Sequence, residues 1–176
     1  MRILEITVDN EIQLDPLMER DAEQIFELIE SNRPLLERYL YWAKTVVDLS
    51  STQEYINERV YSNHFGSAWY KIIFNREVAG IFGIKTIDQE KNSAEVGYWL
   101  CKERQGRGVM TRVLGKIGVY LKDQKNITAL KIHCLSENTA SIAVAERVGG
   151  VHSDTIPNYY LINGTFQDLK IYTVII

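Results

Sequence analysis

The chain has 176 residues, 45% of them hydrophobic and 24% charged, which is the composition of one ordinary globular domain. Its net charge of -3 argues against a general nucleic-acid binder, which carries a basic excess, and a weakly acidic surface favours a cationic partner. Two cysteines are too few for a disulfide framework, and no Cys/His cluster has the spacing of metal ligands. We expect a single domain over residues 1–176 that holds no metal.

The N-terminal residues carry acidic side chains within the first ten positions and form no long apolar stretch. Signal peptides and membrane anchors both need such a stretch. We therefore expect neither of them, no membrane partner, and a cytoplasmic location.

The first third of the chain reads as one short strand followed by helices. Asp21 is expected to cap the first helix, and Ser51 with Glu54 has the spacing of a capping box. In chain order the pattern predicts a strand near 12–17, a helix from 21, a break at 32–34, an aromatic helical segment over 35–42 and a helix over 51–63.

The remaining elements predict a mixed sheet. In chain order they are strands at 68–74, 78–87 and 94–100, a helix over 109–122, a strand at 129–135, a helix over 138–148 and a final hairpin around Asn163-Gly164. The first three strands form an antiparallel meander. The strand–helix–strand unit over 94–135 makes its two strands parallel neighbours in an otherwise antiparallel sheet.

The segment from Leu100 to Thr111 passes from a strand through a glycine-bearing loop into a helix. Unpaired N–H groups at a helix start attract negative charge, and Gly106 and Gly108 allow a ligand to approach the backbone closely. Arg104 and Arg107 add positive charge. Neither a Walker loop nor a dinucleotide fingerprint fits these residues. The residues alone leave two interpretations open, a phosphate site or a plain strand-to-helix turn.

Residues 105–110, Gln-Gly-Arg-Gly-Val-Met, resemble the acyl-CoA loop of the GNAT superfamily of N-acetyltransferases, Gln/Arg-x-x-Gly-x-Gly/Ala. Met110 departs from that pattern and is expected to leave less room beside the pyrophosphate. Residues 94–100, 138–141 and 146–150 resemble three further segments of the family in the same order. The match covers about residues 11–173. Residues 30–42 resemble the branch that acetylates ribosomal-protein N-termini, the RimJ/RimL type.

The resemblance implies an α+β fold: a mixed, mostly antiparallel seven-stranded sheet, helices on both faces, and a central parallel strand pair splayed to hold acyl-CoA. It implies acetyl-CoA as co-substrate. The residues expected to bind it are Tyr98, Trp99, Leu100 and Lys102 by their backbone edges, the loop residues Gln105, Gly106, Arg107, Gly108, Val109, Met110 and Thr111, and Asn138 and Ser141 on the opposite wall. Asn138 can instead act only as a helix cap, and Ser141 can be merely exposed.

Transfer to an amine requires a proton acceptor for the amine and a proton donor for the departing thiolate. Glu95 is the expected base, with a solvent-facing or ion-paired carboxylate as the alternative. Cys134 and Ser141 are the expected acids, with Tyr98 as a further proton source. A small core residue is an equally good interpretation of Cys134. The three histidines show no pattern and are interpreted as solvated or structural.

An acceptor pocket is expected at Asn32, Arg33, Tyr39 and Trp42, although aromatic residues of this kind also serve as packing. The expected acceptor is a protein N-terminal α-amine, ribosomal proteins included. Polyamines, aminoglycosides and amino acids are the small-molecule alternatives, and a non-catalytic acyl-CoA-binding module is the alternative of another class. An apolar strand at 171–176, exposed at a sheet edge, would favour a homo-oligomer.

Overall fold

The computed structural model describes residues 4–176; Met1–Ile3, which begin the stretch analysed above for a signal peptide, lie outside the described residues. The strands are β1 (Ile6–Thr7), β2 (Ile12–Pro16), β3 (Ala68–Phe74), β4 (Glu77–Asp88), β5 (Ser93–Leu100), β6 (Ala129–Leu135), β7 (Val151–Ile162) and β8 (Thr165–Ile175). The α-helices are α1 (Ala22–Ser31), α2 (Arg33–Leu36), α3 (Leu49–Val60), α4 (Val109–Lys125) and α5 (Thr139–Arg147), with short 3-10 turns η1 (Glu19–Asp21), η2 (Tyr41–Lys44) and η3 (Lys102–Arg104).

The strands form one sheet in the order β1-β2-β3-β4-β5-β6-β8-β7. Only β5 and β6 run parallel, and every other pair is antiparallel, as the sequence predicts. The sheet has eight strands and not seven, because the two-residue strand β1 pairs with β2. The apolar strand at 171–176 is not at an edge, because β8 lies between β6 and β7, and β7 is the edge.

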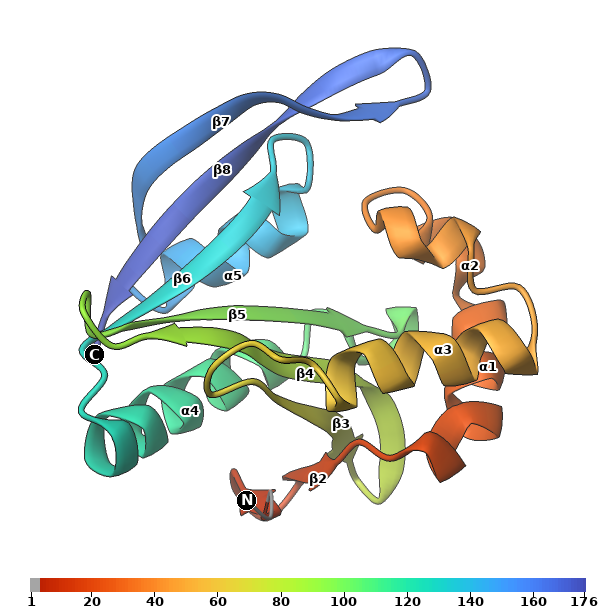
Figure 1. Cartoon of the computed structure of the whole chain (residues 1–176), viewed down its shortest axis with the longest axis horizontal. Coiled ribbons are helices and arrows are strands. Elements are labelled where there is room, and N and C mark those ends of the chain that lie inside the picture. Colours follow the sequence, from red (N-terminus) through yellow and green to blue (C-terminus); the bar gives the residue numbers. More distant parts are fainter. Residues whose placement is uncertain (1–3) are drawn as a thin grey trace.

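The parallel pair separates along its length. Four residue pairs join the strands, from Ser93 opposite Ala129 to Val96 opposite Ile132, and the pairing stops there. Beyond that point β6 stays paired with β8 as far as Leu135. In Figure 1 the two strands meet beside the C-terminus and diverge toward α2. The splayed strand pair is therefore confirmed, and it leaves a gap in the middle of the sheet.

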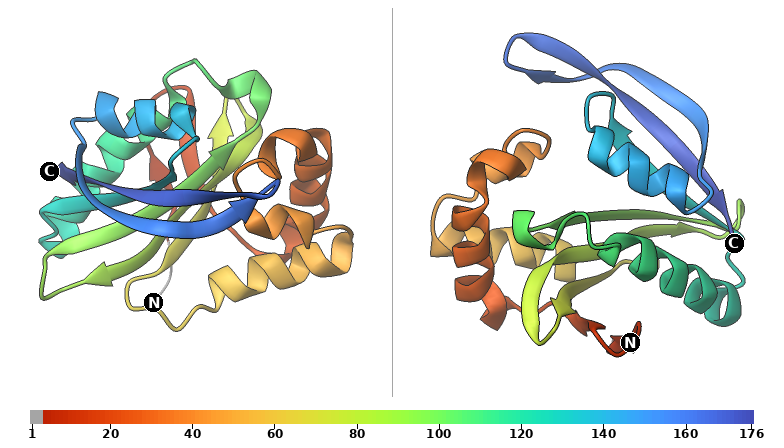
Figure 2. Two further views of the ribbon diagram at one scale, coloured as in Figure 1. Left: turned by 90° about the horizontal axis from the view of Figure 1, so that it is seen from above. Right: turned by 180° about the vertical axis from the view of Figure 1, so that it is seen from behind.

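The two faces of the sheet have separate cores. One buried cluster packs α4 against the sheet, with Val113, Leu114 and Ile117 on its inner side, and Ala145 of α5 belongs to the same cluster. The other contains residues of α1 and α3 together with Trp99. Figure 2 shows the same arrangement from two further directions, with the β7–β8 hairpin extending past the sheet. Helices on both faces are thus confirmed.

The helices of the first third differ in detail from the sequence interpretation. The cap of α3 is Asp48, which accepts a hydrogen bond from the Ser51 N–H at 2.8 Å, so Ser51 is not the cap. Residues 35–42 do not form one helix, because α2 ends at Leu36 and a separate 3-10 turn begins at Tyr41. Asp21 stands at the cap position of α1, yet its carboxylate accepts from the Met18 N–H and from Lys71. Spacing along the sequence does not show which of several possible hydrogen bonds a capping side chain forms.

Candidate active site

The loop between β5 and α4 carries two glycines in a backbone conformation that other residues avoid. Gly106 has φ of 70° and Gly108 has φ of 71°, both in the left-handed region. A Cβ atom built on either glycine would meet nothing within 4 Å. Both glycines therefore satisfy the turn geometry and leave its outer side open to a ligand.

The amino end of α4 offers unpaired amide groups. Gly108 caps the helix without a side-chain hydrogen bond, and the first turn contains no acidic residue. The first helical bond runs from the Arg112 N–H to the Gly108 carbonyl at 3.1 Å. The N–H groups of Val109, Met110 and Thr111 precede this bond and have no intrahelical partner. The helix dipole favours an anion at this position.

A cavity of about 310 Å³ lies along this loop and reaches α5. Its lining includes Gln105, Gly106 and Gly108 on one wall and Ser141, Val144 and Arg147 on the other. We call it the donor cavity. Arg147, which lies in the matching segment 146–150 but was not among the expected ligand-binding residues, adds a positive charge there. The loop amides and this arginine suit a ligand that carries phosphate groups.

Met110 and Thr111 lie at the start of the helix. Met110 is only 3% exposed and packs in the core beneath α4, and it also lines the donor cavity. The expectation that it narrows the space beside a pyrophosphate stays a prediction. The Thr111 hydroxyl lines the donor cavity side of the helix and is buried without a hydrogen-bond partner.

The two arginines of the loop region make different contacts. Arg104 forms an ion pair with Glu77 on β4, yet it also lines the donor cavity. The Arg107 Nε–H donates to the Glu103 carbonyl at 3.1 Å, and Arg107 is exposed outside the donor cavity lining. Gln105 ties the loop to β5, because its amide donates to the Leu100 carbonyl at 3.2 Å.

The free backbone edge of β5 follows from its pairing with β4. The Cys101 N–H donates to the Ala79 carbonyl at 2.8 Å, and alternate residues of an antiparallel ladder bond to the same neighbour. Trp99 therefore directs its backbone toward β4, whereas Tyr98 and Leu100 direct theirs toward the gap. The Lys102 N–H is already engaged, because it donates to the Asn32 side chain at 2.9 Å. Of the four expected backbone partners of a ligand, Tyr98 and Leu100 face the gap, and the Leu100 carbonyl already accepts from the Gln105 amide.

Three proton-bearing side chains meet beside the gap. The Ser141 Oγ lies 3.2 Å from the Cys134 Sγ and 3.4 Å from the Tyr98 hydroxyl. Burial raises the pKa of the Cys134 thiol and raises the pKa of Tyr98 strongly. Both groups consequently keep their protons at neutral pH. Asn138 caps α5 by accepting from the Ser141 N–H at 3.2 Å, which fixes the serine in this position.

A second cavity, of about 200 Å³, opens on the other face of the sheet, and we call it the acceptor cavity. Tyr39, Tyr41 and Trp42, which the sequence indicates, line it together with aromatic residues that the sequence did not indicate: Tyr55, Trp69, Tyr159 and Tyr160. The Tyr39 hydroxyl also donates to the Glu137 carbonyl across the gap at 3.1 Å. The two cavities share six lining residues: Tyr39, Leu40, Tyr98, Trp99, Asn138 and Ser141.

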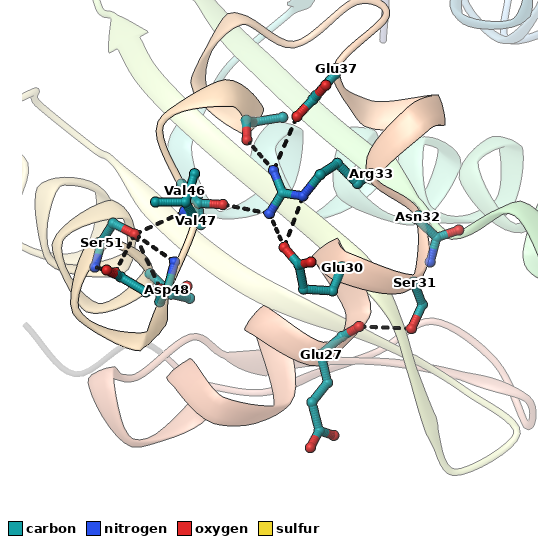
Figure 3. Close-up of polar contacts among 12 residues, drawn as sticks. Glu27, Glu30, Ser31, Asn32, Arg33, Glu37, Val46, Val47, Asp48 and Ser51 are labelled. Atoms are coloured by element: carbon teal, nitrogen blue, oxygen red, sulfur yellow. Dashed lines mark hydrogen bonds and ion pairs between the residues drawn. The ribbon is translucent and has the colours of Figure 1, made fainter.

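Asn32 and Arg33 do not belong to the acceptor cavity, and this part of the expectation is wrong. Asn32 is 4% exposed, accepts from the Lys102 N–H and donates to the Leu28 carbonyl at 2.9 Å. Arg33 pairs with Glu30 and Glu37 and donates to two carbonyls of the segment that leads into α3 (Figure 3). Both side chains hold neighbouring segments together, and all five N–H donors of Arg33 are engaged.

Glu95 has two partners that the sequence did not indicate. Its Oε1 lies 2.5 Å from the Lys85 Nζ and 3.4 Å from the His133 Nδ1. Lys85 and His133 line the acceptor cavity. Among the described residues that line it, none is Asp or Glu. The chain has a net negative charge, yet basic side chains line this cavity. The expectation that the charge of the chain favours a cationic partner therefore does not apply to the acceptor cavity.

His133 has the properties of a proton acceptor. Burial lowers the pKa of His133 below its ordinary value, the Glu95 carboxylate opposes that effect, and Lys85 and Lys131 add to it. The ring is therefore neutral at pH 7. Side chains along β6 alternate between the two faces of the sheet, so His133 and Cys134 point to opposite faces. Only the register of β6 against β5 brings His133 next to Glu95.

Across residues 4–176, every helix falls short of the length and apolar content that crossing a bilayer requires. In the same range, no three His, Cys, Asp or Glu side chains are arranged to hold a metal ion.

Comparison with known proteins agrees with this geometry. Residues 11–151 match a family model described as an acetyltransferase (GNAT) domain. The ribosomal-protein-serine acetyltransferase of Escherichia coli (strain K12) is 25% identical over 172 residues, which cover 97% of this chain and 96% of that enzyme.

Two solved structures are similar over nearly the whole chain. The RimL ribosomal L7/L12 α-N-protein acetyltransferase in complex with coenzyme A has a TM-score of 0.89 at 24% identity, covers 98% of each chain and supports the fold. The microcin C7 self-immunity acetyltransferase MccE, in complex with acetyl-CoA and AMP, has a TM-score of 0.88 at 26% identity and covers 97% of this chain and 96% of that one.

Proposed function

The chain belongs to the GNAT family of acetyltransferases, and we propose that the amine it acetylates is the N-terminal α-amine of a protein. Its activity is acetyl-CoA-dependent N-acetyl transfer. The observation that carries the proposal is the gap between β5 and β6, because the donor and acceptor cavities meet there at Tyr98 and Ser141. An amine that enters from one face can therefore reach a thioester held on the other.

The donor cavity fits the co-substrate. Two glycines with open flanks, three unpaired amides at the start of α4 and the cationic Arg147 face the region where a pyrophosphate would lie. The backbone edges of Tyr98 and Leu100 suit a pantetheine arm. When bound, acetyl-CoA supplies the acetyl group as a thioester. The protein's own side chains orient the reactants and move the protons.

The incoming amine must be neutral to attack. An α-amine has a pKa near ~8 and a lysine-like amine near ~10.4, so an α-amine needs less help from a base at neutral pH. We assign the proton acceptor role to the His133 Nε2, because the ring is neutral and lines the acceptor cavity. Glu95 contacts the other ring nitrogen and acts as a positioning residue. This revises the role that the sequence alone favoured for Glu95.

The departing sulfur must receive a proton on the opposite side. Ser141 is assigned as the donor, and the Tyr98 hydroxyl and the Cys134 thiol stand beside it to replace its proton. Burial keeps both of these neighbours protonated. The base and the acid thus approach the gap from opposite faces of the sheet. We accordingly propose direct transfer between the two bound substrates.

The acceptor cavity favours an α-amine over a polyamine. Its lining carries Arg59 and Lys85 and, within residues 4–176, no carboxylate that would bind a second ammonium group. The names of the relatives point the same way, since one is a ribosomal-protein-serine acetyltransferase.

The test is release of free thiol from acetyl-CoA with a panel of peptides, polyamines, aminoglycosides and amino acids. We expect peptides with a free N-terminus to raise thiol release above hydrolysis, and the same peptides with a blocked N-terminus to have no effect. Tight binding of acetyl-CoA without transfer to any amine would favour the alternative of a non-catalytic acyl-CoA-binding module.

We further propose a cytoplasmic location, where ribosomal proteins are made, and a homodimer formed through the edge strand β7. Val151, Tyr159 and Leu161 on this strand are 70%, 50% and 51% exposed, so an edge strand with open backbone groups also presents apolar side chains. Sedimentation of the wild type and of Leu161→Lys tests the assembly. A monomer at all concentrations would remove the dimer proposal.

A further inference from the structure

Arg59, on the last turn of α3, presents its guanidinium group to the acceptor cavity within a cage of aromatic rings. Its Cζ lies 3.6 Å from the centre of the Tyr55 ring, 5.2 Å from that of Trp69 and 5.7 Å from that of Trp42. One terminal nitrogen donates to the Tyr55 carbonyl at 2.9 Å. Stacking on these rings fixes the plane of the guanidinium group at the cavity wall.

Within the described chain, the bond to the Tyr55 carbonyl is the one hydrogen bond that Arg59 donates, and its other donors have no acceptor. Its Nε is buried without an acceptor, and no carboxylate of residues 4–176 lies within 4.0 Å of the group. Three other arginines, Arg33, Arg104 and Arg112, each form an ion pair. A guanidinium group in a cavity wall without an anionic partner is unfavourable, so its position indicates a ligand that supplies one.

The charges around the cavity point to the same kind of ligand. The other cationic side chain of the lining, Lys85, is neutralised by Glu95, which leaves the charge of Arg59 uncompensated. We propose that the acceptor carries an anionic group, a carboxylate or a phosphate, which Arg59 binds beside the aromatic rings while the amine lies near His133. The inference rests on the proposed acetyl transfer at the same site and specifies its substrate class.

The experiment compares kcat/KM for matched acceptors with and without the anion. The pairs are the peptide amides Ser-Asp-Gly-Gly and Ser-Asn-Gly-Gly, serine and serinamide, and phosphoethanolamine and ethanolamine, so that a peptide side chain, a free amino acid and a phosphate are tested separately. For at least one pair we expect the wild type to prefer the anionic member by about 10- to 100-fold, the range of a hydrogen bond to a charged group.

Arg59→Met keeps an unbranched side chain over the rings and removes the charge. We expect it to abolish the preference through KM, with kcat and acetyl-CoA binding unchanged. Arg59→Lys should retain part of the preference. Arg38→Met is the matched control, because Arg38 stacks on Tyr39 at 5.3 Å but is exposed outside both cavity linings. It should leave the preference intact.

A binding measurement separates this inference from the proposed function. Calorimetry with the N-acetylated members of each pair, in the presence of CoA, needs no turnover. Preferred binding of the anionic products by the wild type without any transfer would uphold the anion site and refute the acetylation proposal. Equal binding and equal kcat/KM within all three pairs would overturn the inference. If Arg59→Met does not fold, these wild-type comparisons decide alone.

Discussion

The two sides of the gap are built in different ways. The donor cavity is made mainly from two continuous segments, the loop that leads into α4 and the start of α5, each tied to a helix end. The acceptor cavity takes residues from η2, α3, four strands and the β7–β8 hairpin. The donor side depends on backbone groups and the acceptor side on side chains. A site whose ligand does not vary can be built from residues close together in the sequence. A site that selects among ligands depends on contacts between segments far apart in the sequence.

The largest effect is expected on the donor side. Gly108→Trp should weaken acetyl-CoA binding about 100-fold or more, because the side chain would fill the open flank and displace one or two charge-assisted hydrogen bonds worth about 1.5–3 kcal/mol each. Calorimetry measures this directly. Gly164→Trp is the control, since Gly164 has the same positive φ and open flank in the terminal hairpin. Unchanged affinity in Gly108→Trp would remove the loop from the site.

On the acceptor side, His133→Gln should lower kcat about 100-fold, the lower end of what a positioned base contributes. Because burial lowers the pKa of His133, the wild-type kcat should fall only below about pH 6.5, as the ring becomes protonated. The variant should lose this acid limb. A retained limb at the same pH would assign it to another group.

At the junction of the two cavities, Ser141→Ala should lower kcat about tenfold, less than a sole acid would, because Tyr98 and Cys134 remain as donors. Ser141→Ala combined with Cys134→Ala should lower it further. Single-turnover measurements with an α-amine acceptor follow the chemical step. If the single variant keeps the wild-type rate, the proton comes from elsewhere.

A smaller change distinguishes Glu95 from His133. Glu95→Gln removes the carboxylate that raises the pKa of His133, so the acid limb of kcat should move to lower pH while the plateau falls less than in His133→Gln. If Glu95 were itself the base, the rate would instead drop most at low pH. The pH profile of kcat decides between these two assignments.

The smallest effect on activity is expected at Asn32. Asn32→Ala leaves the Lys102 N–H without its acceptor and should cost about 1–3 kcal/mol of the free energy of unfolding, with KM for the acceptor unchanged. Denaturant unfolding and steady-state kinetics measure the two quantities. A large rise in KM for the acceptor would return Asn32 to the acceptor site.

The sequence by itself determined the element order, the parallel pair and the family, and it predicted the loop for the co-substrate. These depend on period, turn residues and contiguous motifs, which are local properties of the chain. Gly106, Gly108 and Asn138 could be identified because each acts through its own backbone or its own helix start.

Only the tertiary structure decided how the acceptor side is built. Strand register brings Glu95 into contact with Lys85 and His133. The Asn32 side chain accepts a hydrogen bond from the N–H of Lys102, 70 positions away in the sequence. Arg59 becomes an anion site because no carboxylate of the described chain packs against it. Contacts between distant segments leave no periodic trace in a single sequence, because burial and pairing are set by the packing of whole elements.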